Sequence, residues 1–248
     1  MTMKKAISIA CTAALATLSA GAHAQVSGGV VKIGVLTDLS GTYSDLAGSG
    51  AVLATKMAVE DFIAKEKPDF KIEVVSADHQ NKADIASNKA REWFEREGVD
   101  TATELVTTSV ALAVMKVAKE KDRIALMSGP ASTPITNEQC NDVTVHYTYD
   151  TYALANGTAK AVTKQGGKSW FFLTADYAFG QALEKDASAV VTANGGKVLG
   201  SVRHPFPGSD FSSFLLKAQS SGAQVIGLAN AGADTTNAIK QAAEFGIT

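Results

Sequence analysis

Residues 31–50 read VKIGVLTDLSGTYSDLAGSG, the stretch from which the fold of the whole chain is inferred. Its first part, 31–36, is almost continuously apolar, which is typical of a strand buried on both faces of a parallel sheet. Residues 40–42 predict a turn, and apolar residues at helical spacing from about Ser44 onward predict a helix. This order places residues 42–44 beside a helix N-terminus, where free N–H groups and the helix dipole favour a carboxylate or phosphate. The alternative is an ordinary connecting loop, because any α/β protein has such loops.

The composition indicates a globular α/β protein of one or two domains. The chain has 248 residues, a formal net charge of -2 and a hydrophobic content of 46%, which are ordinary values for that class. A mildly acidic chain has no general attraction for an anionic surface, so we expect no nucleic-acid partner. After the first 24 residues, no apolar run is long enough to span a membrane.

Residues 1–24 have the features of a cleavable signal peptide. Two lysines precede an apolar stretch, and Ala-His-Ala at 22–24 matches the pattern that precedes a signal-peptidase cut. We therefore expect export to the periplasm and a mature chain that starts at Gln25. The mature chain then contains a single cysteine, Cys140, which is either buried and inert or paired with a cysteine outside this sequence.

Strands and helices alternate along the rest of the chain. The further predicted strands cover residues 72–75, 101–106, 124–127, 169–174, 197–202 and 224–229, and the further helices cover 82–97, 110–120, 151–165, 179–194, 211–218 and the residues from about 234. The alternation breaks at 141–150, so we expect a first lobe over residues 25–145 and a second over 146–248. Two such runs predict an α/β fold with two Rossmann-like lobes, each built on a parallel sheet.

Loops at the carboxyl ends of the predicted strands carry hydroxyl, aromatic and amide groups. They cover residues 40–44, 107–109, 128–133 and 175–179, together with Asn230. Ligands of doubly wound sheets bind at these strand ends. The recurrence of polar groups there predicts a ligand cleft between the lobes.

The sequence contains no pattern for catalysis or metal binding. His79, His146 and His204 lie far apart, without a His-Glu-x-x-His motif, and neither a Gly-x-Ser-x-Gly motif nor a Walker-type loop occurs. The Asp78-His79 pair has the composition of a base with its orienting acid, but adjacent residues at a strand end point to opposite sides. We predict no catalytic residue, no metal site and no cofactor, and hence a protein that is not an enzyme.

Five stretches of the chain resemble a known family. They read KIGVLTDLSGTY at 32–43, SADHQNK at 76–82, FLTADYAFG at 172–180, NGGKV at 194–198 and DFS at 210–212. Together they are similar to the periplasmic solute-binding proteins of branched-chain amino acid ABC transporters, the leucine/isoleucine/valine-binding type. The resemblance covers essentially the whole mature chain. It implies the type I periplasmic binding protein fold, in which two Rossmann-like lobes, joined by three crossing segments, close on a ligand.

The same resemblance implies which residues contact the ligand. Hydroxyl and backbone groups of the first lobe would hold the ligand carboxylate, Tyr43 would wall the cleft, and second-lobe residues would contact the rest of the ligand. The implied ligand-binding residues are Tyr43, Thr107, Thr108, Ser109, Ala131, Ser132, Tyr149, Asp150, Tyr177, Phe179 and Asn230. An alternative for the hydroxyls at 107–109 is that they only cap the helix that follows them.

By this resemblance, the protein captures a small carboxylate-bearing solute and delivers it to an inner-membrane ABC permease. The solute would be a branched-chain or other amino acid, or an aromatic or aliphatic acid, and the protein would act as a monomer. The alternative is a ligand-sensing domain of a receptor or regulator with the same fold. Family members are longer than this chain, so we expect an incomplete second lobe. In amino-acid binders the acidic residue that binds the amino group would then lie beyond residue 248.

Overall fold

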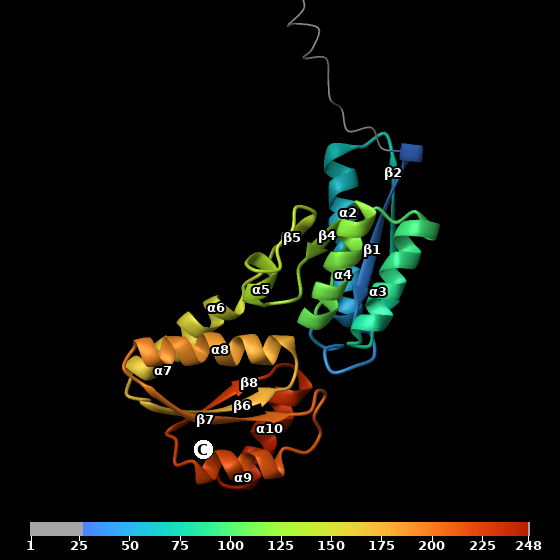
Figure 1. Ribbon diagram of the computed structural model, residues 1–248. Coiled ribbons are helices and arrows are strands. Elements are labelled where there is room, and N and C mark those ends of the chain that lie inside the picture. Colours follow the sequence, from blue (N-terminus) through green and yellow to red (C-terminus); the bar gives the residue numbers. More distant parts are fainter. Residues whose placement is uncertain (1–26, 248) are drawn as a thin grey trace, which may run out of the picture.

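Two α/β lobes make up residues 27–247, the part of the chain that the computed structural model describes. Each lobe consists of a parallel sheet with helices on both faces (Figure 1). This confirms the predicted fold class. The predicted signal peptide at 1–24 lies outside the described residues.

The first lobe is built on a five-stranded sheet with the order β2-β1-β3-β4-β5, in which all neighbours are parallel. After a 3-10 turn at Ser27–Gly29, the strands are β1 (Val30–Thr37), β2 (Lys71–Asp78), β3 (Thr101–Glu104), β4 (Ile124–Met127) and β5 (Thr144–His146). One face is covered by α2 (Gly48–Glu66), and the other by α3 (Ala83–Glu92), the π-helical turn η2 (Trp93–Glu97) and α4 (Thr108–Lys121). The short helix α5 (Thr133–Thr136) follows β4.

The core of the first lobe lies between the sheet and helices α3 and α4. The apolar face predicted for residues 82–97 is buried, and Trp93 is its largest side chain, at 1% exposure. The Trp93 ring packs against Gly34 in the middle of β1, where a Cβ would lie 2.5 Å from the ring. The close approach of this helix to the sheet therefore requires glycine at residue 34.

Helix α2 starts at Gly48, four residues later than the sequence predicts. The turn over residues 43–47, in which the Tyr43 carbonyl accepts from the N–H groups of Leu46 and Ala47 at 3.0 Å, is not continuous with the helix. The backbone is non-helical at Ala47, with φ of -129°, and at Gly48, with φ of 41°. The outer face of the helix carries apolar side chains in contact with solvent, such as Leu53 at 60% exposure. Helical spacing alone thus predicted the helix but not its first turn.

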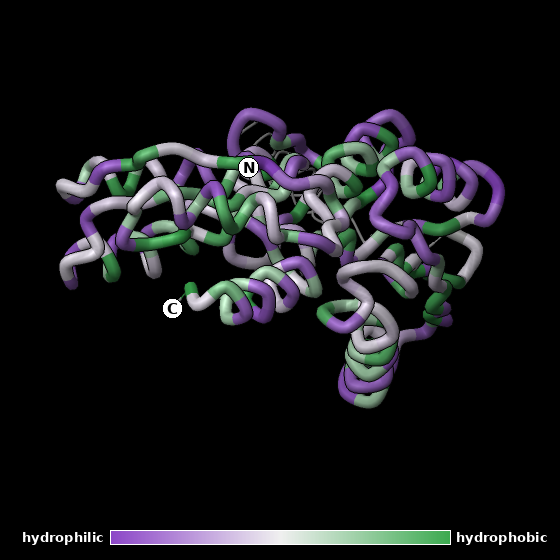
Figure 2. Tube along the Cα trace, turned by 90° about the horizontal axis from the view of Figure 1, so that it is seen from below, coloured by the Kyte–Doolittle hydropathy of each residue, from purple (hydrophilic) through white to green (hydrophobic). Residues whose placement is uncertain are grey.

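The second lobe is built on a three-stranded parallel sheet with the order β7-β6-β8. The strands are β6 (Ser169–Ala175), β7 (Lys197–His204) and β8 (Val225–Ala229). One face is covered by α6 (Thr151–Leu154), the π-helical turn η3 (Ala155–Ala159), α7 (Lys160–Lys164) and α8 (Ala178–Ala193), and the other by α9 (Ser212–Ser220) and α10 (Ala233–Glu244). Figure 2 shows hydrophobic and hydrophilic residues mixed along the helix that leads to the C-terminus, α10, as expected for an amphipathic helix.

Two details of the chain differ from the sequence prediction or extend it. The strand predicted over 101–106 ends at Glu104, because Glu104 and Leu105 leave the extended conformation with φ values of 81° and 59°. The stretch at 141–150, where the predicted alternation breaks, contains β5, the edge strand of the first sheet. The exact limits of the lobes stay a prediction. None of the helices within residues 27–247 combines the length and hydropathy needed to cross a membrane.

Candidate ligand cleft between the lobes

The loop after β1 is held by the carboxylate of Asp38. This side chain is fully buried, and its oxygens accept hydrogen bonds from the backbone N–H groups of Gly41 at 2.7 Å and Tyr43 at 2.8 Å. A Cβ at residue 41 would lie 2.7 Å from the carboxylate, so this wrapping requires glycine. The loop therefore presents Tyr43 in a fixed orientation.

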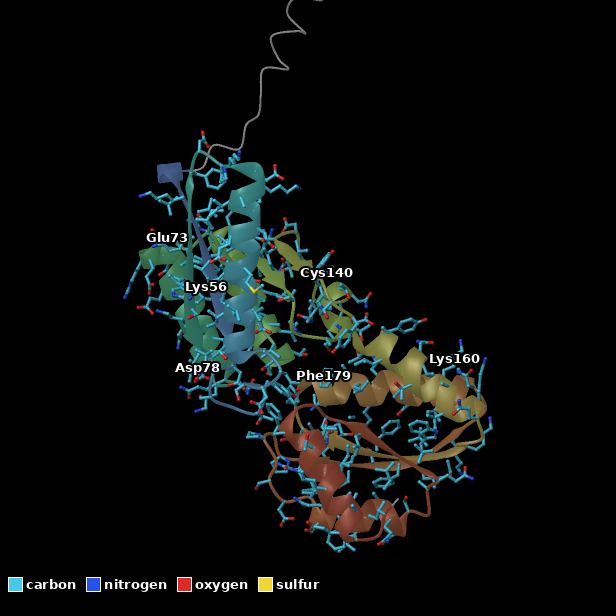
Figure 3. The ribbon with its side chains drawn as sticks, turned by 180° about the vertical axis from the view of Figure 1, so that it is seen from behind. Lys56, Glu73, Asp78, Cys140, Lys160 and Phe179 are labelled. Atoms are coloured by element: carbon cyan, nitrogen blue, oxygen red, sulfur yellow. The ribbon has the colours of Figure 1, made fainter. Side chains whose placement is uncertain are left out.

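Asn81 joins the loops that follow β1, β2 and β3. Its side-chain nitrogen donates to Asp38, and its side-chain oxygen accepts from the hydroxyl of Thr107. Its backbone N–H donates to Nδ1 of the buried His79 at 3.0 Å. Burial lowers the pKa of His79 to about 4, so the imidazole is neutral at pH 7. Figure 3 shows Asp78, the last residue of β2, at the end of the first lobe that is nearest to the second.

The hydroxyl run at residues 107–109 opens helix α4. Thr107 is the N-cap residue, but its side chain accepts no capping hydrogen bond, and its hydroxyl donates to Asn81. The Thr108 hydroxyl is buried and has no hydrogen-bond partner within the described chain, and Ser109 is half-buried. The first turn of α4 therefore has no side-chain cap, and the capping alternative gains no support from these contacts.

The loop after β4 brings another buried hydroxyl to the same sheet edge. Ser132 is fully buried, and its hydroxyl likewise has no partner among residues 27–247. The loop is held at Pro130, whose carbonyl oxygen lies 2.6 Å from Nε2 of His146. It is also held at Thr133, whose backbone N–H donates to the hydroxyl of Thr151 at 3.2 Å. The neighbouring strands β3 and β4 are thus each followed by a buried hydroxyl without a partner in the described chain.

Two tyrosine side chains bridge the lobes. The hydroxyl of Tyr43 in the first lobe is hydrogen-bonded to the hydroxyl of Tyr177 in the second. Both rings pack against Phe206, with centroid distances of 5.4 Å for Tyr43 and 4.1 Å for Tyr177. Burial raises the pKa of both phenols above its ordinary value, so neither is charged at pH 7.

A cavity of about 70 Å³ lies beside this tyrosine pair, between the lobes. It is lined by Tyr43, Leu46, Val106, Gly129, Ala131, Tyr149, Tyr177, Phe179 and Ala231. The structure therefore brings together Tyr43, Ala131, Tyr149, Tyr177 and Phe179 from the set predicted by resemblance. Figure 3 shows Phe179 at the junction of the two lobes.

Two larger cavities adjoin the inter-lobe cavity. One, of about 290 Å³, lies in the second lobe against Trp170, Phe172 and Asn230. The other, of about 750 Å³, lies on the first-lobe side against Glu104. Tyr149 is 61% exposed and lines all three cavities.

Asn230 faces the second-lobe cavity, but its polar atoms are bound within its own lobe. Its side-chain nitrogen lies 3.2 Å from Nε2 of the buried His204, and its oxygen accepts from the Thr235 hydroxyl at 2.7 Å. Nδ1 of His204 lies 2.8 Å from the carbonyl oxygen of Pro205, so Nδ1 carries the proton and Nε2 accepts from Asn230. The second lobe thus offers this cavity a largely apolar wall.

Several predicted residues line none of the three cavities. Asp150 is the N-cap residue of α6, and its carboxylate accepts from the N–H of Ala153 at 2.8 Å. The others outside the linings are Thr107, Thr108, Ser109 and Ser132. At these places the walls are formed by the neighbours Val106 and Ala131.

Glu104 is the main residue that sequence reasoning missed. Its side chain is 4% exposed, and Oε2 accepts from the N–H of Val106 at 2.9 Å. Burial raises the pKa of Glu104 to about 7. The polarity of the predicted strand at 101–106 is its signal in the sequence. Leu46 and Phe206 were also missed, because an apolar residue in a loop carries no chemical signature.

The described residues contain no group of three or more His, Cys, Asp or Glu side chains arranged to hold a metal ion. The three histidines named in the sequence analysis have different partners. His79 is hydrogen-bonded to the N–H of Asn81, His146 to the carbonyl oxygen of Pro130, and His204 to that of Pro205. Cys140 is exposed and forms no disulfide within residues 27–247. Of the two alternatives, the buried and inert cysteine is therefore wrong, and pairing with a cysteine outside this sequence stays a prediction.

Comparison with known proteins shows similarity over nearly all of the described chain. A family model described as periplasmic binding protein matches residues 30–248. The Leu/Ile/Val-binding protein homolog 6 of Brucella abortus is 30% identical over 227 residues, which are 90% of this chain and 55% of that protein. The chain thus spans about half the length of the curated relatives it matches.

Solved structures show the same similarity. A periplasmic binding protein from Burkholderia mallei is 60% identical with a TM-score of 0.86, over 89% of this chain and 59% of that one. A branched chain amino acid ABC transporter periplasmic ligand-binding protein from Burkholderia xenovorans is 40% identical with a TM-score of 0.70, over 88% and 58%. A solute binding protein of an ABC transporter from Rhodopseudomonas palustris, in complex with p-hydroxybenzoic acid, is 25% identical with a TM-score of 0.76, over 88% and 59%. These relatives and neighbours are binding proteins, not enzymes.

Proposed function

The chain belongs to the periplasmic binding protein family, and on this premise we propose that it captures a small carboxylate-bearing solute between its lobes. The observation that carries the proposal is the inter-lobe cavity, which side chains of both lobes line and Tyr43 and Tyr177 bridge. Pockets for small ligands combine apolar and aromatic walls with a few placed polar groups. Adjacent cavities of about 290 and 750 Å³ supply the room that the small central cavity lacks.

In this proposal the first lobe holds the solute carboxylate. The hydroxyls of Thr108 and Ser132 are buried without partners in the described chain, and a buried polar group without a hydrogen bond is unfavourable. The uncapped N–H groups at the start of α4 and the positive end of its dipole add to the attraction for an anion. The Thr107 hydroxyl donates its proton to Asn81, so it does not donate to the solute. Thr107 instead positions this turn.

The walls of the cleft suit an aliphatic or aromatic body on the solute. Tyr43, Tyr149, Tyr177 and Phe179 provide aromatic surface from both lobes. One similar structure is named for branched-chain amino acid transport and another contains p-hydroxybenzoic acid. Both kinds of compound are carboxylates, so we propose this shared chemistry for the present chain.

The proposal is tested by thermal shift and titration calorimetry of the complete chain. The probes are leucine, 4-methylpentanoate, benzoate and 4-hydroxybenzoate, with leucinamide and benzamide as controls that lack the carboxylate. At least one carboxylate should raise the unfolding midpoint, because a ligand that binds only the folded state stabilises it by mass action. The amides should not. Equal shifts with acids and amides, or no shift with any acid, would contradict the proposal.

We further propose a periplasmic location, delivery of the solute to an inner-membrane ABC permease, and a monomeric state. Family membership supports the extracytoplasmic location. Light scattering on the eluting protein should give the mass of one chain. Deletion of the gene should abolish uptake of the bound solute into cells, and unchanged uptake would count against a transport role.

A further inference from the structure

The backbone at the carboxyl end of β3 is unusual. Glu104 and Leu105 have φ values of 81° and 59°, in the left-handed region that is unfavourable for residues with a Cβ. The N–H of Leu105 donates to the carbonyl oxygen of Leu36 at 3.1 Å, and the N–H of Gly129 donates to that of Glu104 at 3.2 Å. The strand end is therefore fixed between the loops after β1 and β4. Strained residues persist where the surrounding structure holds them, and they cluster at binding sites.

This backbone places the Glu104 carboxyl at the wall of a cavity. The side chain is 4% exposed, and Oε2 accepts from the N–H of Val106 at 2.9 Å. Oε1 points along Gly129, where a Cβ would lie 2.2 Å from it, so a side chain at residue 129 would block this oxygen. No cationic side chain within residues 27–247 acts on the carboxyl. A hydrogen bond with the Thr37 side chain also stabilises the carboxylate. A carboxylate has about four lone-pair sites, so Glu104 is a buried acid with acceptor capacity left over.

The surroundings of Glu104 are acidic. It lines the first-lobe cavity of about 750 Å³ together with Asp45, and no Lys, Arg or His of the described chain takes part in that lining. The buried carboxylate of Asp38 adds to burial in raising the pKa of Glu104 to about 7. A solute group that donates a hydrogen bond to the carboxylate would offset both the cost of burying its charge and its repulsion by Asp38.

We propose that Glu104 determines which solutes bind, by accepting a hydrogen bond from a hydroxyl or ammonium group of the solute. This inference rests on the proposed solute-binding function. Val106, Gly129 and Tyr149 line both the inter-lobe cavity and the cavity of Glu104. A solute in the first therefore lies next to the second. A solute without a donor would bury this carboxyl with its remaining acceptor capacity unused and would bind less tightly, since sites built to hydrogen-bond a group reject analogues that lack it.

The test uses pairs of probes that differ only in the donor. Leucine and 4-methylpentanoate differ by the ammonium group, and 4-hydroxybenzoate and benzoate differ by the hydroxyl. In calorimetry on the complete chain, the donor-bearing member of at least one pair should bind about tenfold more tightly or better, as expected for a hydrogen bond to a charged group. The pair that shows the preference identifies the donor.

Variants of Glu104 distinguish a role in solute selection from a purely structural role. Glu104→Leu should abolish the preference. Glu104→Gln should reduce a preference for ammonium to about twofold or less, and should keep part of a preference for hydroxyl, because the amide oxygen still accepts. The control Asp45→Asn changes an exposed acid of the same cavity and should leave the preference unchanged within about twofold.

The outcomes are distinguishable. If acids bind but neither pair shows a preference, or if Glu104→Leu folds and keeps the wild-type preference, the role of Glu104 is contradicted and solute binding stands. If none of the four acids binds, the proposed function itself fails, and the inference fails with it.

Discussion

The two lobes share the order of three strands, but the polar groups at their strand ends differ in hydrogen bonding. The order β2-β1-β3 in the first corresponds to β7-β6-β8 in the second. Each lobe has a fully buried histidine at the equivalent strand end. His79 follows β2, and His204 is the last residue of β7. Both ring nitrogens of His204 have partners. In contrast, Nε2 of His79 has none in the described part of the chain.

The same contrast extends to the other polar groups of the two edges. In the first lobe, the hydroxyls of Thr108 and Ser132 are buried without partners in the described chain. In the second, Asn230 is bonded to His204 and to Thr235. Threonines with buried hydroxyls also lie at the end of β1 and one residue before the end of β6, so that position does not distinguish the two lobes. The difference supports the proposal that the first lobe binds the polar end of a solute, while the second covers its apolar body.

The largest expected effect is on the two free hydroxyls of the first lobe. Thr108→Ala with Ser132→Ala should weaken binding of a carboxylate probe about a hundredfold or more, because each hydrogen bond to a charged group contributes about 1.5 to 3 kcal/mol. The matched control is Thr163→Ala, which removes a buried unpartnered hydroxyl from α7 of the second lobe. It should change affinity less than about threefold. Calorimetry measures the affinity of each variant for the carboxylate probe. Similar losses of affinity in the double variant and the control would contradict the proposed difference between the lobes.

The second effect concerns stability and the charge on Glu104. Its pKa is raised from the ordinary 4.5 to about 7, so the folded state binds the proton more tightly than the unfolded state. Its contribution to stability is complete below pH 4.5 and is lost as the pH rises through 7, by about 3 kcal/mol. Urea unfolding should show this loss in the wild type and not in Glu104→Gln. Parallel pH profiles of the two proteins would show that Glu104 is not buried in this way.

His79 should give the opposite pH dependence. Burial lowers its pKa from 6.5 to about 4, so the unfolded state binds the proton more tightly. Its contribution is complete above pH 6.5 and is lost as the pH falls through 4, by about 3 kcal/mol. NMR titration of the imidazole should show a neutral ring down to about pH 4. A midpoint near 6.5 would mean that this edge of the first lobe is open to water.

The smallest effect is expected at the contact between the lobes. Tyr43→Phe and Tyr177→Phe should each reduce stability by about 1 kcal/mol, the typical net contribution of one hydrogen bond. Because the two hydroxyls bond to each other, the double variant should cost no more than either single one. Additive losses in this double-mutant cycle would show that the hydroxyls act independently.

The sequence predicted the order of strands and helices because hydrophobic periodicity is a local property. It also indicated that ligand groups gather at the strand ends, since parallel topology brings those ends to one edge. The start of α2 at Gly48 could not be predicted, because it depends on the non-helical backbone of Ala47 and Gly48, which hydrophobic spacing does not encode. The orientation of Glu104 was hidden for a similar reason, as it depends on a positive φ at a strand end that is hydrogen-bonded to β1 and to the loop after β4.

The most direct measurement is a crystal structure of the chain with the tightest-binding acid among the four probes. The solute carboxylate should lie within hydrogen-bond distance of the Thr108 and Ser132 hydroxyls, with its apolar body against Tyr177 and Phe179. A carboxylate bound instead to second-lobe groups such as Asn230, with the Thr108 and Ser132 hydroxyls still unpartnered, would contradict the assignment of the polar end to the first lobe.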